Sequence, residues 1–371
     1  MTADQRFPTY EAEERRRGAL PPGIEPVPLH GTGAPALPDH IVDAVAAVLA
    51  RPMQTPPVNG SGSLRQALAV ELERTTTRSV DPESQILVTN GAMQALGVCF
   101  RSLLQPGDEV VVPAPTFFFG GPIRTAGGIP VYVRGSEADG WRWDAGAIEQ
   151  AIGSRTRALL LCNPGNPTGY APSPEDVAAV VAVAERHGLV IVTDEAYEAS
   201  LWDGAPFTSA FGVGDDVIVI RSLGKSLSLP QLRLGLLAGT AARVARCTRT
   251  LEWDCLRVNV ASQEAARAAL EGPRGWLEQI HAATEADRAV AIAAVAETPG
   301  LTAAPPFAAP FLFVGSPGEG LAEQLEVVGL PVVDGAAFEG PGYARLPFGG
   351  AAEARDPLRQ ALDRWAQQHA R

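Results

Sequence analysis

Lysine is almost absent from this sequence. Lys225 is the one lysine among the 30 lysine and arginine residues, so nearly every basic side chain is an arginine. Arginine stays protonated in proteins, whereas a lysine amine can lose its proton in a desolvated pocket and attack a carbonyl to form an imine. A leftover surface lysine is the alternative. Because the neighbours of Lys225 also have the features of a site, we favour a functional role.

Cysteine is scarce as well. The four cysteines, Cys99, Cys162, Cys247 and Cys255, are scattered along the chain. They form no CxxC pair and have no histidine at ligand spacing, so the sequence indicates neither a zinc site nor a disulfide framework. We therefore expect reduced, structural thiols and no metal.

Basic charge and long apolar runs are also missing. The formal net charge is −12, which disfavours a nucleic-acid partner, because phosphates need a basic face. No stretch has 18 uninterrupted apolar residues, and residues 1–20 lack an apolar signal region, so we expect no membrane partner. The sequence predicts a cytoplasmic protein that acts on small molecules.

Short apolar stretches recur between helical patterns. A chain of 371 residues with 46% hydrophobic content can bury a large core and normally forms about two domains. The apolar stretches predict buried strands. They lie at residues 85–89, 108–112, 130–133, 158–162, 188–192 and 217–220, and near the C-terminus at 307–315, 330–338 and 342–350.

Helices are expected between these strands. Amphipathic patterns predict them at residues 39–50, 63–75, 174–188 and 351–370, with a long helix from about residue 273. The charges at residues 10–18 have the spacing of a short helix, but a solvated arm is favoured there. The candidate N-cap residues are Ser63, Asp144 and Ser173.

Polar residues follow three of the predicted strands. NPGNPTG (163–169) follows 158–162, TDEAY (193–197) follows 188–192, and SLGKS with Lys225 follows 217–220. Ligands in α/β sheets bind at this carboxyl edge. Ser222 and Arg233 offer a hydroxyl and a guanidinium that suit a phosphate dianion. An imine-forming lysine beside a phosphate site implies pyridoxal 5′-phosphate (PLP).

With Arg233, these three motifs resemble the class I and II aminotransferases of PLP fold type I. The resemblance runs from about residue 25 to the C-terminus. It implies an α/β fold with a mostly parallel central sheet, in which 236–240 is an antiparallel strand. It also implies a large PLP-binding domain at 46–264, and an N-terminal arm and small α+β domain from 1–45 and 265–371. A homodimer with shared active sites is expected.

The resemblance assigns roles around the cofactor ring. Lys225 would form the imine and move the substrate's α-proton, and Asp194 would keep the pyridine nitrogen protonated. Asn166 and Tyr197 would contact the phenolic oxygen, and Asn166 would also contact the substrate. Phe117 would stack on the ring.

Further residues are assigned to the phosphate and to the protein interior. Glu195 points to the opposite face from Asp194, so we expect it to be structural. Phe118 and Phe119 are expected in the core or in the substrate wall. The expected phosphate ligands are Gly91, Ala92, Met93, Ser222 and Arg233.

Three residues are candidates for substrate binding. Arg345 lies in the strand where relatives place the arginine that grips the substrate carboxylate, and a surface arginine is the alternative. Gly33, or else Gly31, belongs to a turn that lies over that carboxylate. Arg257 resembles an arginine that some relatives send into the neighbouring subunit, and Trp253 and Asn259 are comparable wall candidates.

The resemblance implies a PLP-dependent aminotransferase that moves an amino group from an L-amino acid to a 2-oxo acid. One departure keeps rivals open, because Thr55 stands where many relatives have a tyrosine that reaches the partner's phosphate. A specialised enzyme of the same fold is one rival: a decarboxylase, an eliminating or cyclising synthase, or an oxidase. A PLP-binding regulator is another, and would need a basic DNA-binding domain that this sequence lacks.

Overall fold

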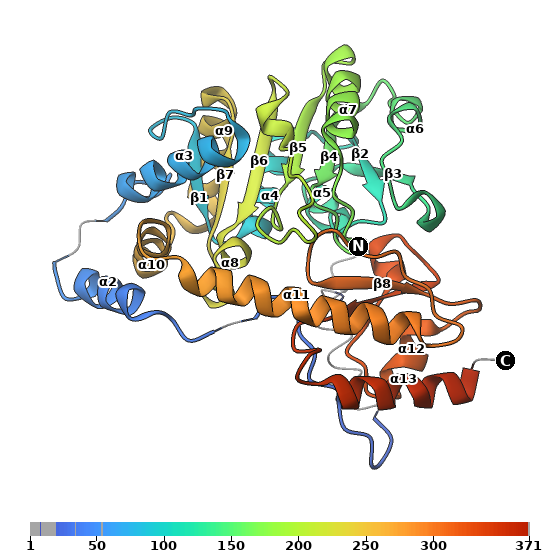
Figure 1. The fold of residues 1–371 in the computed structure, drawn as a ribbon. Helices are drawn as coiled ribbons and strands as arrows, with labels where there is room; N and C mark the ends of the chain where they lie inside the picture. Colours follow the sequence, from blue (N-terminus) through green and yellow to red (C-terminus); the bar gives the residue numbers. More distant parts are fainter. Residues whose placement is uncertain (1–7, 9–19, 34, 53–54, 370–371) are drawn as a thin grey trace.

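The computed structural model describes residues 8, 20–33, 35–52 and 55–369. A large sheet and a smaller one form two parts of the molecule, and the long helix α11 (Gly275–Ala296) runs from one part to the other (Figure 1). The segment 10–18, where a solvated arm is favoured over a short helix, lies outside the described residues.

The large sheet has seven strands in the order β1-β7-β6-β5-β4-β2-β3. β7 is antiparallel to β1 and to β6, as predicted, and the other adjacent pairs are parallel. The strands are β1 (Ile86–Thr89), β2 (Glu109–Ala114), β3 (Ile129–Arg134), β4 (Thr156–Cys162), β5 (Val190–Asp194), β6 (Val217–Ser222) and β7 (Gly235–Ala238).

The central strands are buried on both faces, which explains their uninterrupted apolar sequences. Alternate residues enter two different cores: Val217 and Val219 pack on one face, and Ile218 and Ile220 on the other. The first face is covered by α3 (Gly62–Thr76), α7 (Pro174–Arg186) and α10 (Val260–Glu271), and the second by α4 (Ala92–Leu103), α5 (Gly120–Thr125) and α9 (Ala241–Cys255).

Two of the three predicted N-caps are confirmed. Ser173 forms a capping box with Asp176 at the start of α7, and Asp144 caps α6 (Ala145–Gln150). The prediction for Ser63 is wrong. The N-cap of α3 is Ser61, because its carbonyl already accepts the first helical hydrogen bond, from the Arg65 N–H. The Ser61 side chain makes no cap hydrogen bond.

The smaller sheet has the order β8-β10-β9, with β8 (Phe311–Gly315), β9 (Val333–Asp334) and β10 (Tyr343–Pro347). The predicted strand at 330–338 is mostly wrong, since β9 has two residues. The Asp334 side chain accepts from the Ala336 N–H at 2.8 Å and starts the 3-10 helix η4 (Gly335–Phe338). The helices of this part are α12 (Leu321–Glu326) and α13 (Arg355–His369).

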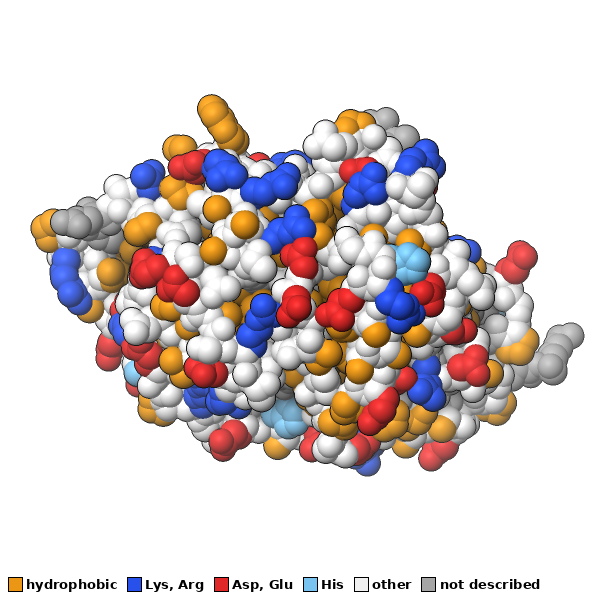
Figure 2. All heavy atoms as spheres, turned by 90° about the horizontal axis from the view of Figure 1, so that it is seen from above, with side chains coloured by type: hydrophobic (Ala, Val, Ile, Leu, Met, Phe, Trp, Pro, Cys, Tyr) orange, Lys and Arg blue, Asp and Glu red, His pale blue; other side chains and the backbone are white. Residues whose placement is uncertain are grey.

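α11 joins the two parts through its packing. Trp276 and Leu277 in its first turn pack on the core of the large sheet, and Ala291 and Val295 near its end belong to the core of the smaller part. At the N-terminal side, α2 (Asp39–Leu49) packs on α10. Among the described residues, no helix is both long and apolar enough to cross a bilayer. On the face drawn in Figure 2, acidic and basic side chains are interspersed.

Candidate active site

Three predicted motifs meet at the carboxyl edge of the large sheet. Cys162 at the end of β4 pairs with Asp194 at the end of β5, and Asp194 pairs with Ile220 near the end of β6. The short helix α8 (Leu223–Ser226) follows β6 directly and carries Lys225. Parallel strands in register therefore gather the three motifs, as the sequence predicts.

Lys225 is half-buried, with its Nζ 5.7 Å from the centroid of the Tyr197 ring. Burial lowers the pKa of the Lys225 amine to about 8, and the positive charges of Arg345 and Arg233 act in the same direction. Near neutral pH, a much larger fraction of the Lys225 amine is therefore neutral and nucleophilic than in an exposed lysine.

Asp194 is 6% exposed, and its Oδ1 accepts from the Ala196 N–H at 3.0 Å. Burial raises the pKa of the Asp194 carboxyl to about 7. The Ala196 hydrogen bond opposes this rise, and the charge of Glu195 adds to it. No basic side chain of the described part of the chain pairs with Asp194. A buried carboxylate in this state is suited to a cationic N–H donor that enters the site.

Arg345 on β10 is 8% exposed and reaches across from the smaller part to the motif after β4. Its Nη1 donates to Asn166 Oδ1 at 3.2 Å. The guanidinium carbon lies 4.2 Å from the centroid of the Phe311 ring and 4.7 Å from that of Phe338. The buried Nε of Arg345 has no hydrogen-bond partner, and burial lowers the pKa of the guanidinium to about 10.

Arg345 thus stays charged at neutral pH without a carboxylate partner among the described residues. Tyr197 lies close by, since its ring packs edge-on against Phe311 with 5.8 Å between centroids. Burial raises the pKa of the Tyr197 hydroxyl, and the charge of Arg345 opposes that rise. The structure therefore brings Lys225, Asn166, Tyr197 and Arg345 into one cluster. The sequence contains no signal for the Phe311 and Phe338 clamp around Arg345.

The start of α4 supplies N–H groups for an anion. Gly91, with φ +82°, is the N-cap, and a β-carbon there would lie 3.1 Å from Arg233 Nη2. The exposed Arg233 guanidinium therefore lies beside the free N–H groups of the first turn, where Ala92 and Met93 follow. Ser222 ends β6 opposite Gly235. Guanidinium, hydroxyl and helix N-terminus suit a phosphate dianion.

The three consecutive phenylalanines separate as expected. Phe119 is fully buried in the core, and Phe118 packs on Phe338 with 4.7 Å between ring centroids. Phe117 stays half-buried, 4.6 Å from Phe118. Phe118 is therefore part of the wall behind Arg345.

The turn at 31–33 lies near this cluster. A β-carbon on Gly31 would lie 3.3 Å from the Phe311 ring, and one on Gly33 would lie 3.6 Å from the His30 ring. Gly33 also lines a cavity of about 420 Å³ that reaches Lys225. Another lining residue, Glu198, was not singled out from the sequence: its buried Oε2 has no hydrogen-bond partner, and burial raises the pKa of its carboxyl to about 7.

The remaining substrate candidates lie at the surface. Arg257 is exposed and donates from Nε to the Pro56 carbonyl at 2.8 Å. Trp253 is 93% exposed in the single chain. Asn259 is exposed and serves as N-cap of α10. Thr55 is exposed as well.

Known proteins match this chain over most of its length. The family model for aminotransferase class I and II matches residues 30–362. The aspartate aminotransferase of Geobacillus stearothermophilus is 30% identical over an alignment 353 residues long, and the match covers 90% of this chain and 89% of that protein. That of Streptomyces avermitilis is 31% identical over an alignment 361 residues long, which covers 91% of this chain and 88% of that protein.

A solved structure gives the same result for the fold. The structure of a single mutant of Thermus thermophilus aspartate aminotransferase matches with a TM-score of 0.89 at 29% identity, and the match covers 98% of this chain and 97% of that one. The fold class expected from the sequence is confirmed.

Proposed function

The chain belongs to the class I and II aminotransferases and is an aminotransferase of fold type I; from this premise we propose that it binds PLP at Lys225 and moves an amino group from an L-amino acid to a 2-oxo acid. The rival reactions of the same fold are not favoured, because the relatives named above are aminotransferases.

Two buried charges without counterions are the observation that carries this proposal. Among the described residues, Asp194 has no basic partner, and Arg345 has no carboxylate and an unpaired Nε. A protonated pyridine nitrogen would pair with Asp194, and a substrate carboxylate would pair with Arg345. The residues therefore fit PLP and an amino acid.

Bound PLP supplies an aldehyde that condenses with amines and a ring that takes up the electrons left at the substrate's α-carbon. The Lys225 amine takes the proton from that carbon, and its lowered pKa makes the neutral base available. Arg345 orients the substrate through its carboxylate, and the Phe311 and Phe338 rings hold the guanidinium in place. Asp194 keeps the ring nitrogen protonated.

The remaining cofactor contacts are proposed from the same cluster. Asn166 and Tyr197 would contact the phenolic oxygen, and Asn166 would also contact the substrate, because it bonds Arg345. Phe117 would cover the ring. Gly91, Ala92 and Met93 at the start of α4 would hold the phosphate together with Ser222 and Arg233.

The relatives named aspartate aminotransferase make aspartate the first amino donor to test. An acidic side chain needs a further cation beyond Arg345. We propose that Arg257 of a neighbouring subunit supplies it in a homodimer with shared active sites, while Gly33 covers the substrate carboxylate. A cytoplasmic location and the domain limits at 46–264, and at 1–45 with 265–371, also remain proposals.

Single-turnover spectra test the proposed reaction. The PLP-loaded protein is mixed with a panel of L-amino acids, acidic and aromatic ones included, without an acceptor. We expect the yellow absorbance to disappear once and stop, because the amino group stays on the cofactor, and 2-oxoglutarate or pyruvate to restore it. Sustained turnover without an oxo acid would contradict transamination and indicate a decarboxylase, eliminase or oxidase.

A further inference from the structure

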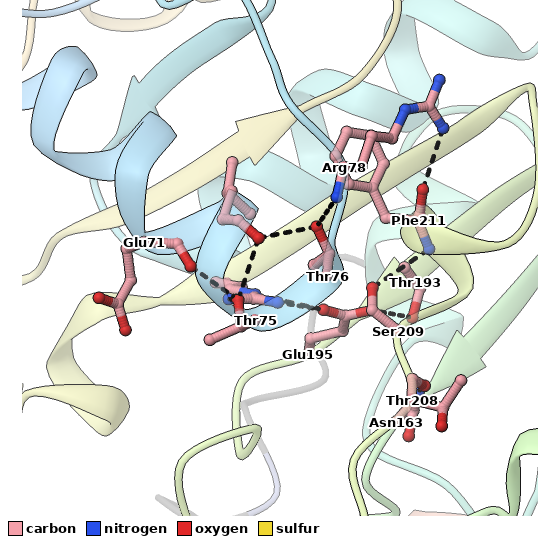
Figure 3. Close-up of polar contacts among 12 residues, drawn as sticks. Glu71, Thr75, Thr76, Arg78, Asn163, Thr193, Glu195, Thr208, Ser209 and Phe211 are labelled. Atoms are coloured by element: carbon pink, nitrogen blue, oxygen red, sulfur yellow. Dashed lines mark hydrogen bonds and ion pairs between the residues drawn. The ribbon is translucent and has the colours of Figure 1, made fainter.

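Two adjacent carboxylates at the end of β5 have opposite surroundings. Asp194 lies in the Lys225 site, whereas Glu195 points to the other side of the sheet, toward α3 and η2 (Ala210–Gly212) (Figure 3). The Glu195 backbone N–H donates to the Ile220 carbonyl at 2.8 Å, so the chain is still tied to β6 at this point. Any displacement of Glu195 therefore also displaces Asp194.

Glu195 is fully buried, and both of its carboxylate oxygens are occupied. Arg221 donates to Oε2 from Nε at 3.2 Å and from Nη2 at 2.9 Å. Ser209 and Thr193 donate their hydroxyls to Oε1. The carboxylate is thus held from β6, from β5 itself and from the residue that precedes η2 (Figure 3).

Arg221, 2% exposed, extends the same network to α3. Its Nη1 donates to Thr75 Oγ1 at 2.7 Å, and that hydroxyl donates to the Glu71 carbonyl at 2.8 Å. Arg221 is also the residue directly before Ser222, from which α8 and Lys225 begin. Glu195 therefore directly follows Asp194 in the chain, and its partner Arg221 directly precedes the segment that carries Lys225.

Stability alone does not account for this pair. Removing two charges from water costs free energy that their attraction often only just repays, and well-packed apolar residues in the same place are often equally stable. Geometry is a better explanation, because a fork of two N–H groups on one carboxylate oxygen, with three further hydroxyl contacts, permits few arrangements.

We propose that Glu195 and Arg221 form a positioning pair, which sets the spacing between the Asp194 carboxylate and residues 222–225. The inference rests on the PLP site proposed above. The pair would hold the groups for the ring nitrogen and for the phosphate at the separation that one rigid cofactor requires. The pair acts through these two chain segments, and Arg221 also lines the cavity that reaches Lys225.

A double-mutant cycle on cofactor binding tests the pair. Binding of pyridoxamine 5′-phosphate, which needs no bond to Lys225, is measured by calorimetry. The four proteins are the parent, Asp194→Asn, the pair variant Glu195→Gln with Arg221→Met, and the triple variant. The pair variant removes both charges together, so that neither Glu195 nor Arg221 is left buried without its partner.

If the pair acts through Asp194, the pair variant and Asp194→Asn each weaken binding by about tenfold or more. The affinity of the triple variant for pyridoxamine 5′-phosphate should then lie within about threefold of that of the weaker-binding of these two variants. Unchanged binding by the pair variant would refute the proposal. So would losses that multiply in the triple variant, because the pair would then act independently of Asp194.

The control is the ion pair at the other end of the same strand. Arg243 forms a similar fork on Asp216, directly before β6, with bonds of 3.1 and 2.6 Å. Arg243→Met with Asp216→Asn should bind pyridoxamine 5′-phosphate like the parent. A parent that binds neither this ligand nor PLP would defeat the proposed function instead, so the two failures are distinguishable.

A milder change covers the case in which the pair variant does not fold. Arg221→Lys keeps the positive charge but loses the fork and the bond to Thr75. When Arg221→Lys is combined with Asp194→Asn, the loss of affinity for pyridoxamine 5′-phosphate should again be smaller than the product of the two single losses. Binding equal to the parent, or multiplying losses, would overturn the proposal in this variant too.

Discussion

At Lys225, burial and two nearby guanidinium groups lower the pKa of the amine together. At Arg345, the buried guanidinium group contacts two aromatic rings and one side-chain amide. Both residues are therefore poised for an incoming molecule, one as a nucleophile and base, the other as a cation. Each role can be tested by a single measurement on the purified protein.

The rate of PLP uptake should follow the protonation of Lys225. The protonated amine cannot attack the aldehyde, so uptake should rise with pH, with a midpoint near 8, and level off above it. Stopped-flow absorbance measures the rate, and borohydride then fixes the cofactor to the protein. Because Lys225 is the single lysine, the labelled peptide is unambiguous. A midpoint near 10.5 would mean that the amine is not desolvated.

Arg345→Lys should raise the apparent substrate constant. The variant keeps the charge but loses the planar fork, at a cost on the order of 2 kcal/mol in substrate binding, while PLP binding stays intact. Steady-state kinetics with the best amino donor measure the change. Arg359→Lys, on the exposed face of α13, is the matched control. An unchanged substrate constant would place the carboxylate site elsewhere.

At the scale of elements, two helix starts have different tasks. α7 begins with a complete capping box, in which Ser173 and Asp176 satisfy each other's backbone N–H groups. α4 begins with Gly91, which has no side chain, and so leaves its first N–H groups free beside Arg233. The first arrangement stabilises the helix, and the second leaves donors for an anion.

Ser173→Ala should lower the free energy of unfolding by about 1 kcal/mol, because the variant leaves the Asp176 N–H without its cap. Urea denaturation followed by circular dichroism measures this. Ser61→Ala is the control, since Ser61 is an N-cap whose side chain makes no cap bond, and it should change stability much less. Equal losses in the two variants would contradict the assignment of the caps.

Gly91→Ala should weaken PLP binding, because the added β-carbon would lie 3.1 Å from Arg233 Nη2 and the backbone has φ +82°. Gly107→Ala is a matched control with φ +88° and no atom within 4 Å. Both variants should lose about 1 kcal/mol of stability through backbone strain. Only Gly91→Ala should bind PLP more weakly in equilibrium dialysis. Similar PLP affinities would argue against a phosphate site at α4.

For the whole molecule, the end of α9 is a conspicuous surface. Trp253 is 93% exposed and Leu256 64% exposed, and Arg257 follows directly. Large apolar side chains in water at one place indicate a contact surface. This is the region from which the proposed homodimer would send Arg257 into the neighbouring site.

The parent protein should sediment as a dimer, and Trp253→Glu with Leu256→Glu should shift it toward the monomer. Charged side chains in the contact would cost desolvation free energy that the isolated subunit does not incur. Analytical ultracentrifugation measures the mass. Val213→Glu, at another exposed apolar position, should leave the dimer unchanged. A double variant that remains fully dimeric would exclude this surface as the interface.

The sequence by itself determined the strands of the large sheet and the polar motifs that follow them. Lys225 is the single lysine and follows an apolar strand, and the motifs of Asp194 and Asn166 lie at the ends of two more strands that meet at the same edge of a sheet. The resemblance to the aminotransferases then assigns the roles of Asp194 and Asn166. The cap at Ser173 was also readable, because a capping box is formed by residues three apart. Such features depend on local spacing, which the chain carries in its own order.

Only the tertiary structure decided which distant segments meet. Phe311 and Phe338 enclose Arg345 through the pairing of β8 with β10 and the turn at η4. The spacing of these three residues along the chain does not predict this contact. The sequence predicts a structural role for Glu195, but only the fold places Arg221 of the next strand against its carboxylate. Contacts of this kind depend on packing between elements, and side-chain periodicity tells which face a residue occupies but not what lies opposite.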